Sequence, residues 1–205
     1  LNHRPKLTER VFRELVEGFE AGAPGWKLEG DGDFPWEDVW WVRAVSPTVH
    51  VLLGPNPRGT GLTSATSPAL AVGAGPLRVV FSQTYGFENA VQFFDGGRLE
   101  VSTDGVTFTA VPPSALTPTY PGTLLADTTN PLAGQPAFVG VNLNRADVTV
   151  ELGTQYANQT VWLRWVIGAD QSGGGAGWSV DDVRVTGLTT QPFTELVAHR
   201  GLCMN

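Results

Sequence analysis

Hydrophobic and polar residues alternate over much of this chain. Residues 77–85, 98–102, 106–111 and 146–152 place apolar side chains at most second positions. A period of two buries one face of a β-strand and leaves the other toward solvent. Residues 160–168, with the sequence TVWLRWVIG, are the most strand-like segment of all. The pattern therefore predicts a chain of roughly ten short strands.

Turn-forming residues separate these runs. The chain contains 25 Gly and 15 Pro, and they stand mainly between the apolar segments. Thr103-Asp104-Gly105 lies between two alternating runs and predicts a hairpin, because Asp-Gly readily adopts positive φ. Residues 112–137 hold six prolines and predict a long loop, a candidate binding or lid segment. Many short strands with turns between them predict an antiparallel two-sheet β-sandwich of the jelly-roll type.

The two ends of the chain differ from this pattern. Residues 1–18 have apolar residues at helical spacing after a possible cap at Thr8, which predicts one short N-terminal helix. The alternative is that part of this segment is the first strand. The expected organisation is an N-terminal arm or helix over 1–18, a sandwich over 19–187 and a C-terminal tail over 188–205.

Composition excludes several classes of protein. The 20 acidic and 13 basic residues give a formal charge of −7, and no basic stripe exists that would bind nucleic acid. No run of apolar residues is long enough for a membrane-spanning helix. Cys203 is the single cysteine, so a disulfide framework is excluded. Few Cys, Met and Lys with abundant Gly and Thr indicate an exported bacterial protein, secreted or at the cell surface. Because the chain begins at Leu1 without a signal peptide, we expect a processed product or a segment of a longer protein.

Four stretches taken together resemble a known architecture. They are Phe19-Glu20 with Gly25-Trp26, Tyr85 to Glu88 with Phe94 to Ser102, Thr160 to Trp165 with Gly168 to Asp170, and Gly177 to Val183. In this order they resemble the MAM-like, concanavalin-like jelly-roll accessory domains of secreted bacterial metallopeptidases of the immune inhibitor A type. They are also similar to jelly-roll carbohydrate-binding modules of glycoside hydrolases. The HExxH motif of the peptidases is absent, so the resemblance is to their accessory domain only.

The resemblance implies a calcium ion that ties the first strand to the last, with Glu20 and Asp181 or Asp182 as ligands. Calcium takes six to eight oxygen ligands. Adjacent carboxylates on a strand point to opposite faces, so only one of the two aspartates reaches the ion unless a bulge re-aims the other. If Val183 faces the core, Asp181 shares its face, and we therefore prefer Asp181. The alternative is that the aspartate pair forms a salt bridge with an arginine or caps a turn.

Acidic and aromatic residues also gather in residues 30–41. Asp31, Asp33, Trp36, Trp40 and Trp41 are candidate ligand-binding residues. They could form a second cation site, or a surface where tryptophan faces stack on sugar rings and carboxylates bind sugar hydroxyls. In a third interpretation the loop is solvated and its tryptophans belong to the core, since large aromatic side chains bury most of their area.

Catalytic residues are not evident. The three histidines are far apart in sequence, and no Gly-x-Ser-x-Gly motif occurs. We therefore expect a non-catalytic accessory or binding module, stabilised by calcium and attached to an extracellular hydrolase such as a metallopeptidase. The alternatives are a carbohydrate-binding module and a structural or adhesion domain. The expected partners are a glycan, a protein surface or other domains of the parent protein.

Overall fold

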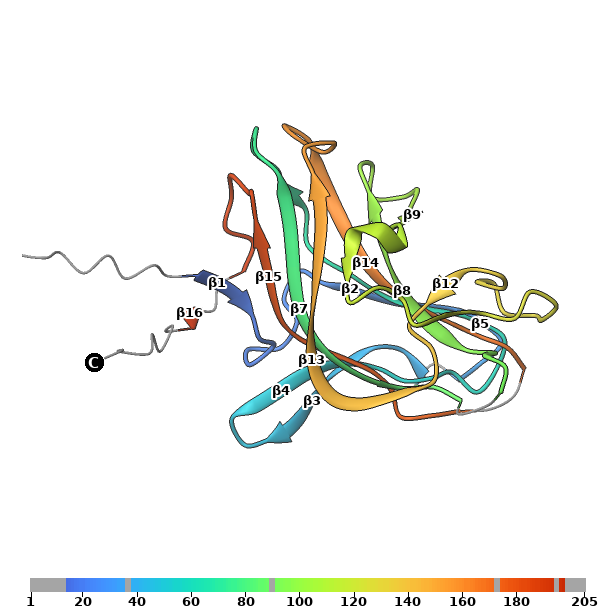
Figure 1. The fold of residues 1–205 in the computed structure, drawn as a ribbon. Helices are drawn as coiled ribbons and strands as arrows, with labels where there is room; N and C mark the ends of the chain where they lie inside the picture. Colours follow the sequence, from blue (N-terminus) through green and yellow to red (C-terminus); the bar gives the residue numbers. More distant parts are fainter. Residues whose placement is uncertain (1–13, 36–37, 89–90, 172–173, 194–195, 198–205) are drawn as a thin grey trace, which may run out of the picture.

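The chain folds as a sandwich of two antiparallel β-sheets (Figure 1). The computed structural model describes residues 14–35, 38–88, 91–171, 174–193 and 196–197. The predicted jelly-roll sandwich is confirmed by the two packed sheets. No helix among the described residues has the length and apolar character needed to cross a membrane.

The larger sheet contains the first and last strands of the fold. In hydrogen-bonded order its strands are β10 (Leu116–Thr117), β13 (Val141–Gly153), β7 (Leu77–Gly86), β15 (Gly177–Thr186), β1 (Glu14–Glu17) and β16 (Leu196–Val197). Two further strands, β4 (Val49–Gly54) and β3 (Trp41–Ser46), form a hairpin that pairs with β15 through β4. In Figure 1 this hairpin projects from the lower edge of the sheet.

The smaller sheet lies behind the larger one in Figure 1. In order, its strands are β2 (Lys27–Gly32), β5 (Gly61–Thr66), β14 (Thr160–Ala169), β8 (Gly96–Ser102) and β9 (Thr109–Ala110), with β6 (Leu70–Ala71) paired to β14. The predicted strand-like segment 160–168 is therefore the centre of this sheet. Its alternate residues Val161, Leu163 and Trp165 are fully buried.

The turn after β8 is held by the predicted Asp-Gly pair. The Asp104 carboxylate accepts hydrogen bonds from the backbone amides of Val106 (2.8 Å) and Thr107 (2.7 Å) and from the Ser102 hydroxyl (2.8 Å). Gly105 has the positive φ of 72° that the turn requires. The hydrogen bond from Thr107, followed by the others, holds the pKa of Asp104 well below its ordinary value. The hairpin prediction is confirmed.

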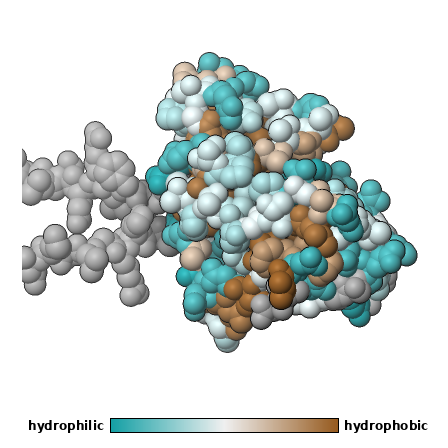
Figure 2. All heavy atoms as spheres, turned by 45° about the vertical axis from the view of Figure 1, so that its right-hand side comes forward, coloured by the Kyte–Doolittle hydropathy of each residue, from teal (hydrophilic) through white to brown (hydrophobic). Residues whose placement is uncertain are grey.

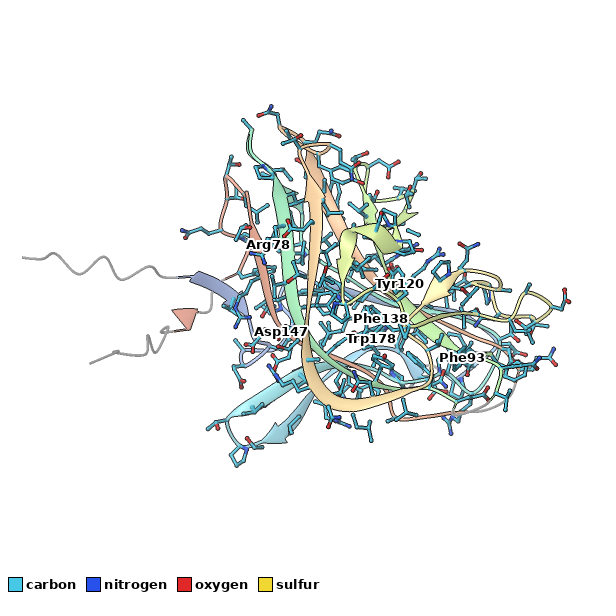
Figure 3. All side chains as sticks on the ribbon, in the orientation of Figure 1. Arg78, Phe93, Tyr120, Phe138, Asp147 and Trp178 are labelled. Atoms are coloured by element: carbon cyan, nitrogen blue, oxygen red, sulfur yellow. The ribbon has the colours of Figure 1, made fainter. Side chains whose placement is uncertain are left out.

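Aromatic side chains fill the space between the sheets. The ring of Phe81 lies edge-on to Trp165 at 5.5 Å between centroids, and Phe138 lies 5.5 Å from Trp178. Figure 3 shows Phe138 and Trp178 in the middle of the sandwich. Each such side chain buries about 150–250 Å², worth roughly 4–6 kcal/mol as an upper estimate. The core therefore depends on a few large rings.

The N-terminal helix prediction is wrong for the residues that can be described. Residues 14–17 form β1, and Val16 pairs with Arg184 of β15. The alternative of a first strand is thus confirmed, while Thr8 lies outside the described residues. The buried Glu17 accepts hydrogen bonds from the Phe19 amide and the Trp26 indole, both at 3.2 Å. Those bonds lock the turn that leads from one sheet to the other.

The C-terminal tail packs against the sandwich where it is described. Phe193 is buried in the core, and Leu196 of β16 pairs with Leu15 of β1. Residues 198–205 lie outside the described part of the chain.

The proline-rich segment 112–137 adds β10 to the larger sheet, and its later part packs on the smaller sheet. It contains a short 3-10 helix, η2 (Pro113–Ala115), and a small hairpin of β11 (Gly122–Thr123) and β12 (Pro136–Ala137). Leu124 and Leu132 from this segment pack with Val166 of β14 in a second apolar cluster. The predicted loop is thus an ordered cover with its own small core, and a ligand or lid role stays a prediction.

Close packing of Trp178 against β8 leads to a test. A Cβ atom at Gly97 would lie 2.4 Å from the Trp178 ring, whereas one at Gly75 meets nothing within 4 Å. We expect Gly97→Ala to lower the free energy of unfolding by about 1–3 kcal/mol, because the ring cannot retreat in a filled core. Gly75→Ala, the matched control, should change it by less than about 0.5 kcal/mol. Urea denaturation of both variants measures the difference, and equal stabilities would contradict this packing.

Candidate functional site

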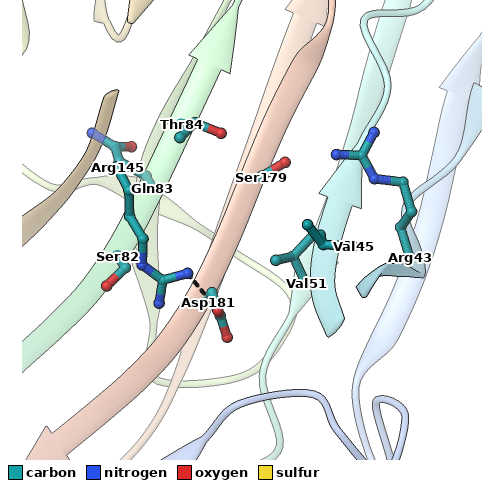
Figure 4. A pocket seen from close by; sticks show the side chains of 9 residues that line it. All are labelled: Arg43, Val45, Val51, Ser82, Gln83, Thr84, Arg145, Ser179 and Asp181. Carbon is teal, nitrogen blue, oxygen red and sulfur yellow. Dashed lines mark hydrogen bonds and ion pairs between the residues drawn. The ribbon is translucent and has the colours of Figure 1, made fainter. Parts of the chain in front are cut away.

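A cleft lies on the outer face of the larger sheet, between the β3–β4 hairpin and β13 (Figure 4). Its volume is about 210 Å³. We call it the arginine cleft. The residues that line it are Arg43, Val45, Val51, Ser82, Gln83, Thr84, Arg145, Ser179 and Asp181.

Strand register builds the floor of this cleft. On β15, Ser179 lies between Leu53 of β4 and Thr84 of β7. Two residues along β15, Asp181 lies opposite Ser82. Because Trp178 and Val180 point into the core, the alternate residues Ser179 and Asp181 face outward. The floor is therefore made of short polar side chains on rigid, fully paired strands.

Some of these hydroxyl groups are already engaged and others are free. Ser82 donates a hydrogen bond of 2.6 Å to Asp147 of β13, which Figure 3 labels on that strand. No side chain in the described part of the chain engages the hydroxyl groups of Thr84 and Ser179. Two hydroxyls on the cleft floor are thus available to a polar ligand.

Arg145 bridges the two aspartates of the last strand. Its Nη1 donates to Asp181 Oδ2 at 2.7 Å, and its Nη2 donates to Asp182 Oδ2 at 2.6 Å. The position of Arg145 comes from an irregularity in β13, where the register with β7 shifts between Asn142 and Ala146. Burial raises the pKa of Asp181, against the opposing effect of Arg145. The alternative of an arginine salt bridge, left open by the sequence, is observed here.

A bulge in β15 places Asp181 and Val183 on opposite faces of the sheet. The pairing with β7 shifts register between Asp181 and Arg184, and Asp182 has a positive φ of 49°. The prediction that Asp181 shares the inward face of Val183 is therefore wrong. The extra residue reverses the alternation, so Val183 is buried in the core while Asp181 faces the cleft.

The predicted calcium ligands have other partners in the structure. Glu20 contacts His50 of β4, with 2.7 Å between Glu20 Oε2 and His50 Nδ1. Across the described ranges, no group of three or more Asp, Glu, His or Cys side chains could hold a metal ion. Glu20, Asp181 and Asp182 as arranged do not fit a shared calcium ion, which needs six to eight oxygens. Calcium stays a prediction of the sequence.

The other wall of the cleft is apolar and carries a second arginine. Arg43 lies opposite Val51 across the β3–β4 hairpin, and Figure 4 shows Arg43 and Arg145 on opposite sides of β15. Trp41, two residues before Arg43, lies on the same face of β3 and is 40% exposed. Figure 2 shows hydrophobic surface low in the molecule. On β13, the apolar side chains of Val141 and Leu143 are exposed.

The acidic and aromatic residues of segment 30–41 lie in different parts of the structure. The interpretation of Trp40 as a ligand-binding residue is wrong, because it is 3% exposed and packs 5.9 Å from Trp178. Asp31 and Asp33 are exposed, and Asp31 lies on β2 of the other sheet. Trp36 lies outside the described residues. Trp41 is the predicted aromatic residue that is exposed, on the same strand as Arg43.

Asp31 helps to line a groove on the smaller sheet that the sequence did not predict as a site. This groove has a volume of about 260 Å³ and is lined by Glu29, Gly30, Asp31, Leu62, Ser64, Arg164 and Val166. At its edge Arg164 donates through Nε to Glu100 (2.7 Å), and its guanidinium lies 3.9 Å over the Phe108 ring. Glu100 also binds Arg98. Only strand register joins Arg164 to this network, since it lies 64 positions from Glu100.

A buried carboxylate joins three loops at one end of the sandwich. Asp95 is 1% exposed and accepts hydrogen bonds of 2.9 Å from the Asn56 side chain and from the Asp170 amide. Burial raises the pKa of Asp95 to about 6, with a smaller contribution from the charges of Glu88 and Asp170. The sequence pattern did not single out Asp95, because a turn aspartate usually lies in solvent.

This carboxylate makes stability depend on pH. The folded pKa of Asp95 lies above its ordinary value of 3.8, so the native state holds more protons between pH 4 and 6 and loses stability as pH rises through that window. Asp95→Asn removes the ionisable group, and the unpartnered Asn56 Oδ1 can turn to accept from the new amide. We expect the melting temperature of the variant to exceed that of wild type by a few degrees at pH 7.5 and to match it near pH 4.

Asp104→Asn provides a control of opposite sign. Because the folded pKa of Asp104 is lowered by its hydrogen bonds, the substitution should lower the melting temperature at pH 7.5. A melting temperature for Asp95→Asn below that of wild type at pH 7.5 would show that the ionised carboxylate is required.

Mutation can separate the contribution of Arg145 to stability from that of a calcium ion. Arg145→Gln leaves Asp181 buried without its cation, and we expect a loss of about 1–3 kcal/mol in the free energy of unfolding at pH 7. The double variant Arg145→Gln, Asp181→Asn should recover most of that loss, because both charges are gone. The same denaturation curves with and without EDTA test the calcium prediction: an ion at these aspartates would make wild type, but not the double variant, less stable in EDTA, and identical wild-type curves would contradict it.

Comparison with solved structures shows which folds are similar to this one. The K3 cleaved adhesin domain of Lys-gingipain from Porphyromonas gingivalis W83 matches with a TM-score of 0.52 and 16% identity over 85% of this chain and 98% of that one. The K1 cleaved adhesin domain of the same protein matches with a TM-score of 0.50 and 19% identity over 84% and 96%. A carbohydrate-binding module, TmCBM61, solved in complex with β-1,4-galactotriose, has a TM-score of 0.48 and 13% identity over 82% and 93%.

At identities this low, the matches show a shared fold and no more. No protein-family model matches the sequence, and no curated protein matches it either. The neighbours include adhesin domains and jelly-roll carbohydrate-binding modules. The more specific resemblance to metallopeptidase accessory domains stays a prediction.

Proposed function

We propose that this chain is a non-catalytic binding module and that the arginine cleft binds a glycan. The observation that carries the proposal is the side-chain composition of the cleft. Free hydroxyls of Thr84 and Ser179 lie on its floor, Val45 and Val51 form an apolar strip, and two guanidinium groups flank them. A sugar ring has polar edges and apolar faces, and it needs this mixture.

The position of the cleft favours a glycan over an extended peptide. A peptide strand binds most readily to a free sheet edge, where unpaired backbone groups can form a ladder with it. The cleft instead lies on the face of the sheet, and its floor strand β15 is paired with β7 on one side and β4 on the other. A ligand there must be recognised by side chains, which suits sugar hydroxyls.

Binding without catalysis follows from the carboxylates. Glycoside hydrolysis usually needs two carboxyl groups flanking the scissile bond, about 5–10 Å apart. Among the residues that line the cleft, Asp181 is the carboxylate, and Arg145 already binds it. A lone carboxylate held in a salt bridge supports recognition and not acid–base chemistry.

The exterior of a bacterial cell is the proposed location, with the module attached to a hydrolase such as a metallopeptidase. Composition supports an exported protein, and the adhesin domains of Lys-gingipain supply a structural parallel for an attached binding module. The same parallel supports adhesion as a second candidate function. The exposed Val141 and Leu143 beside the cleft would then contribute to a protein contact.

Glycan binding can be tested with Trp41, an exposed ring two residues before Arg43 on β3. On a glycan array we expect wild-type protein to bind a subset of oligosaccharides. Trp41→Ala should weaken the affinity for those glycans at least tenfold, about 1.4 kcal/mol, because a stacking surface is lost. Val106→Ala, at an exposed turn on the other sheet, should leave affinity unchanged. Absence of binding to every glycan would overturn the proposal.

A further inference from the structure

We propose that the ligand of the arginine cleft is an acidic glycan whose sugar units carry a carboxylate, and that Arg43 binds this carboxylate. The inference rests on the proposed function of the cleft and names its ligand class. It is carried by the charges around the cleft, which differ from those of the chain as a whole.

Among the residues that line the cleft, arginines outnumber carboxylates although the protein is acidic. The chain has a formal charge of −7, yet the residues that line the cleft include two arginines and one carboxylate, Asp181. Salt screens charges beyond about 8 Å at physiological ionic strength. Distant acidic residues are therefore screened from a ligand inside the cleft. The two acidic residues just outside the lining, Asp147 and Asp182, are already bound to Ser82 and Arg145.

The two arginines differ in their ion-pair partners. The guanidinium of Arg145 forms ion pairs with two carboxylates, Asp181 at 2.7 Å and Asp182 at 2.6 Å, and these hold it in place. Arg43 is exposed on β3 and has no carboxylate partner within the described ranges. Its guanidinium is thus the one on the cleft wall that remains open to a ligand anion.

The surroundings of Arg43 match a sugar that carries one carboxylate. A guanidinium offers a planar pair of N–H donors that suits the two oxygens of a carboxylate. Next to Arg43, Val51 and Val45 offer an apolar surface for the sugar ring, and the hydroxyls of Ser179 and Thr84 lie across β15. One unpaired guanidinium balances one negative charge, whereas a heavily sulfated chain would also meet Asp181 and Asp182.

The experiment compares matched ligands by isothermal titration calorimetry. The probes are uronic-acid oligosaccharides of several linkages and the same oligosaccharides after their carboxyl groups have been reduced to the neutral alcohol. We expect at least one uronic-acid oligosaccharide to bind wild-type protein at least tenfold more tightly than its reduced form. Affinity for that oligosaccharide should also fall as salt concentration rises.

Variants assign the effect to Arg43. Arg43→Gln should weaken binding of the acidic oligosaccharide at least tenfold and leave the weak binding of the reduced form unchanged. Arg78→Gln is the matched control, since Arg78 is an arginine of the same sheet that pairs with Glu151 outside the cleft. Its affinities should equal those of wild type, and unchanged melting temperatures would verify that both variants are folded.

The possible failures are distinguishable. Equal affinity for the acidic and reduced oligosaccharides would overturn the acidic-ligand inference while the glycan-binding function stands. Full affinity of Arg43→Gln for the acidic form would overturn the role of Arg43. No binding of any oligosaccharide, with binding of a polyglutamate peptide instead, would overturn both and indicate a protein partner.

Discussion

Trp178 packs between the two sheets, and its surroundings set their spacing. The ring is fully buried, donates a hydrogen bond from Nε1 to Gln83 at 2.8 Å, and lies directly over Gly97 of the opposite sheet. Around it stand Phe81, Phe138 and Trp40. Because β15 holds this ring, the strand is anchored to both layers at its start. Everything that follows Trp178 on β15, including the floor of the arginine cleft, is positioned by that anchor.

The bulge after Asp181 lets both aspartates of β15 form ion pairs with Arg145. Without it, strict alternation from Trp178 and Val180 would bury Asp182 next and place Val183 outside. The left-handed backbone of Asp182 inserts one extra position, so Val183 returns to the core and both carboxylates reach Arg145. Bulges commonly occur where a sheet presents side chains to a ligand. Here the bulge supplies a fixed ion pair at one side of a cleft whose other arginine is free.

Rigidity of the sheet face would favour selective binding in the proposed glycan cleft. The polar groups of its floor come from strands paired on both sides, so few of them need to be ordered when a ligand binds. The smaller sheet carries a comparable arrangement, in which Glu100 and Phe108 hold Arg164 at the edge of a groove. In both sheets an arginine is oriented by carboxylates before any ligand arrives. Such pre-organisation reduces the entropy lost on association.

The local sequence pattern was sufficient to predict the strands and the hairpin of this protein, but not its candidate site. Alternation in residues 77–85 and 160–168, and the Asp-Gly turn at Asp104, determined strands, a hairpin and a two-sheet sandwich, because period and turn geometry are properties of neighbouring residues. The sequence could not separate buried Trp40 from exposed Trp41, since one residue of register exchanges their faces. Nor could it join Arg145 to Asp181, 36 positions away, because only the pairing of β13, β7 and β15 brings them together. Which charges are paired and which are left for a ligand was decided by the tertiary structure alone.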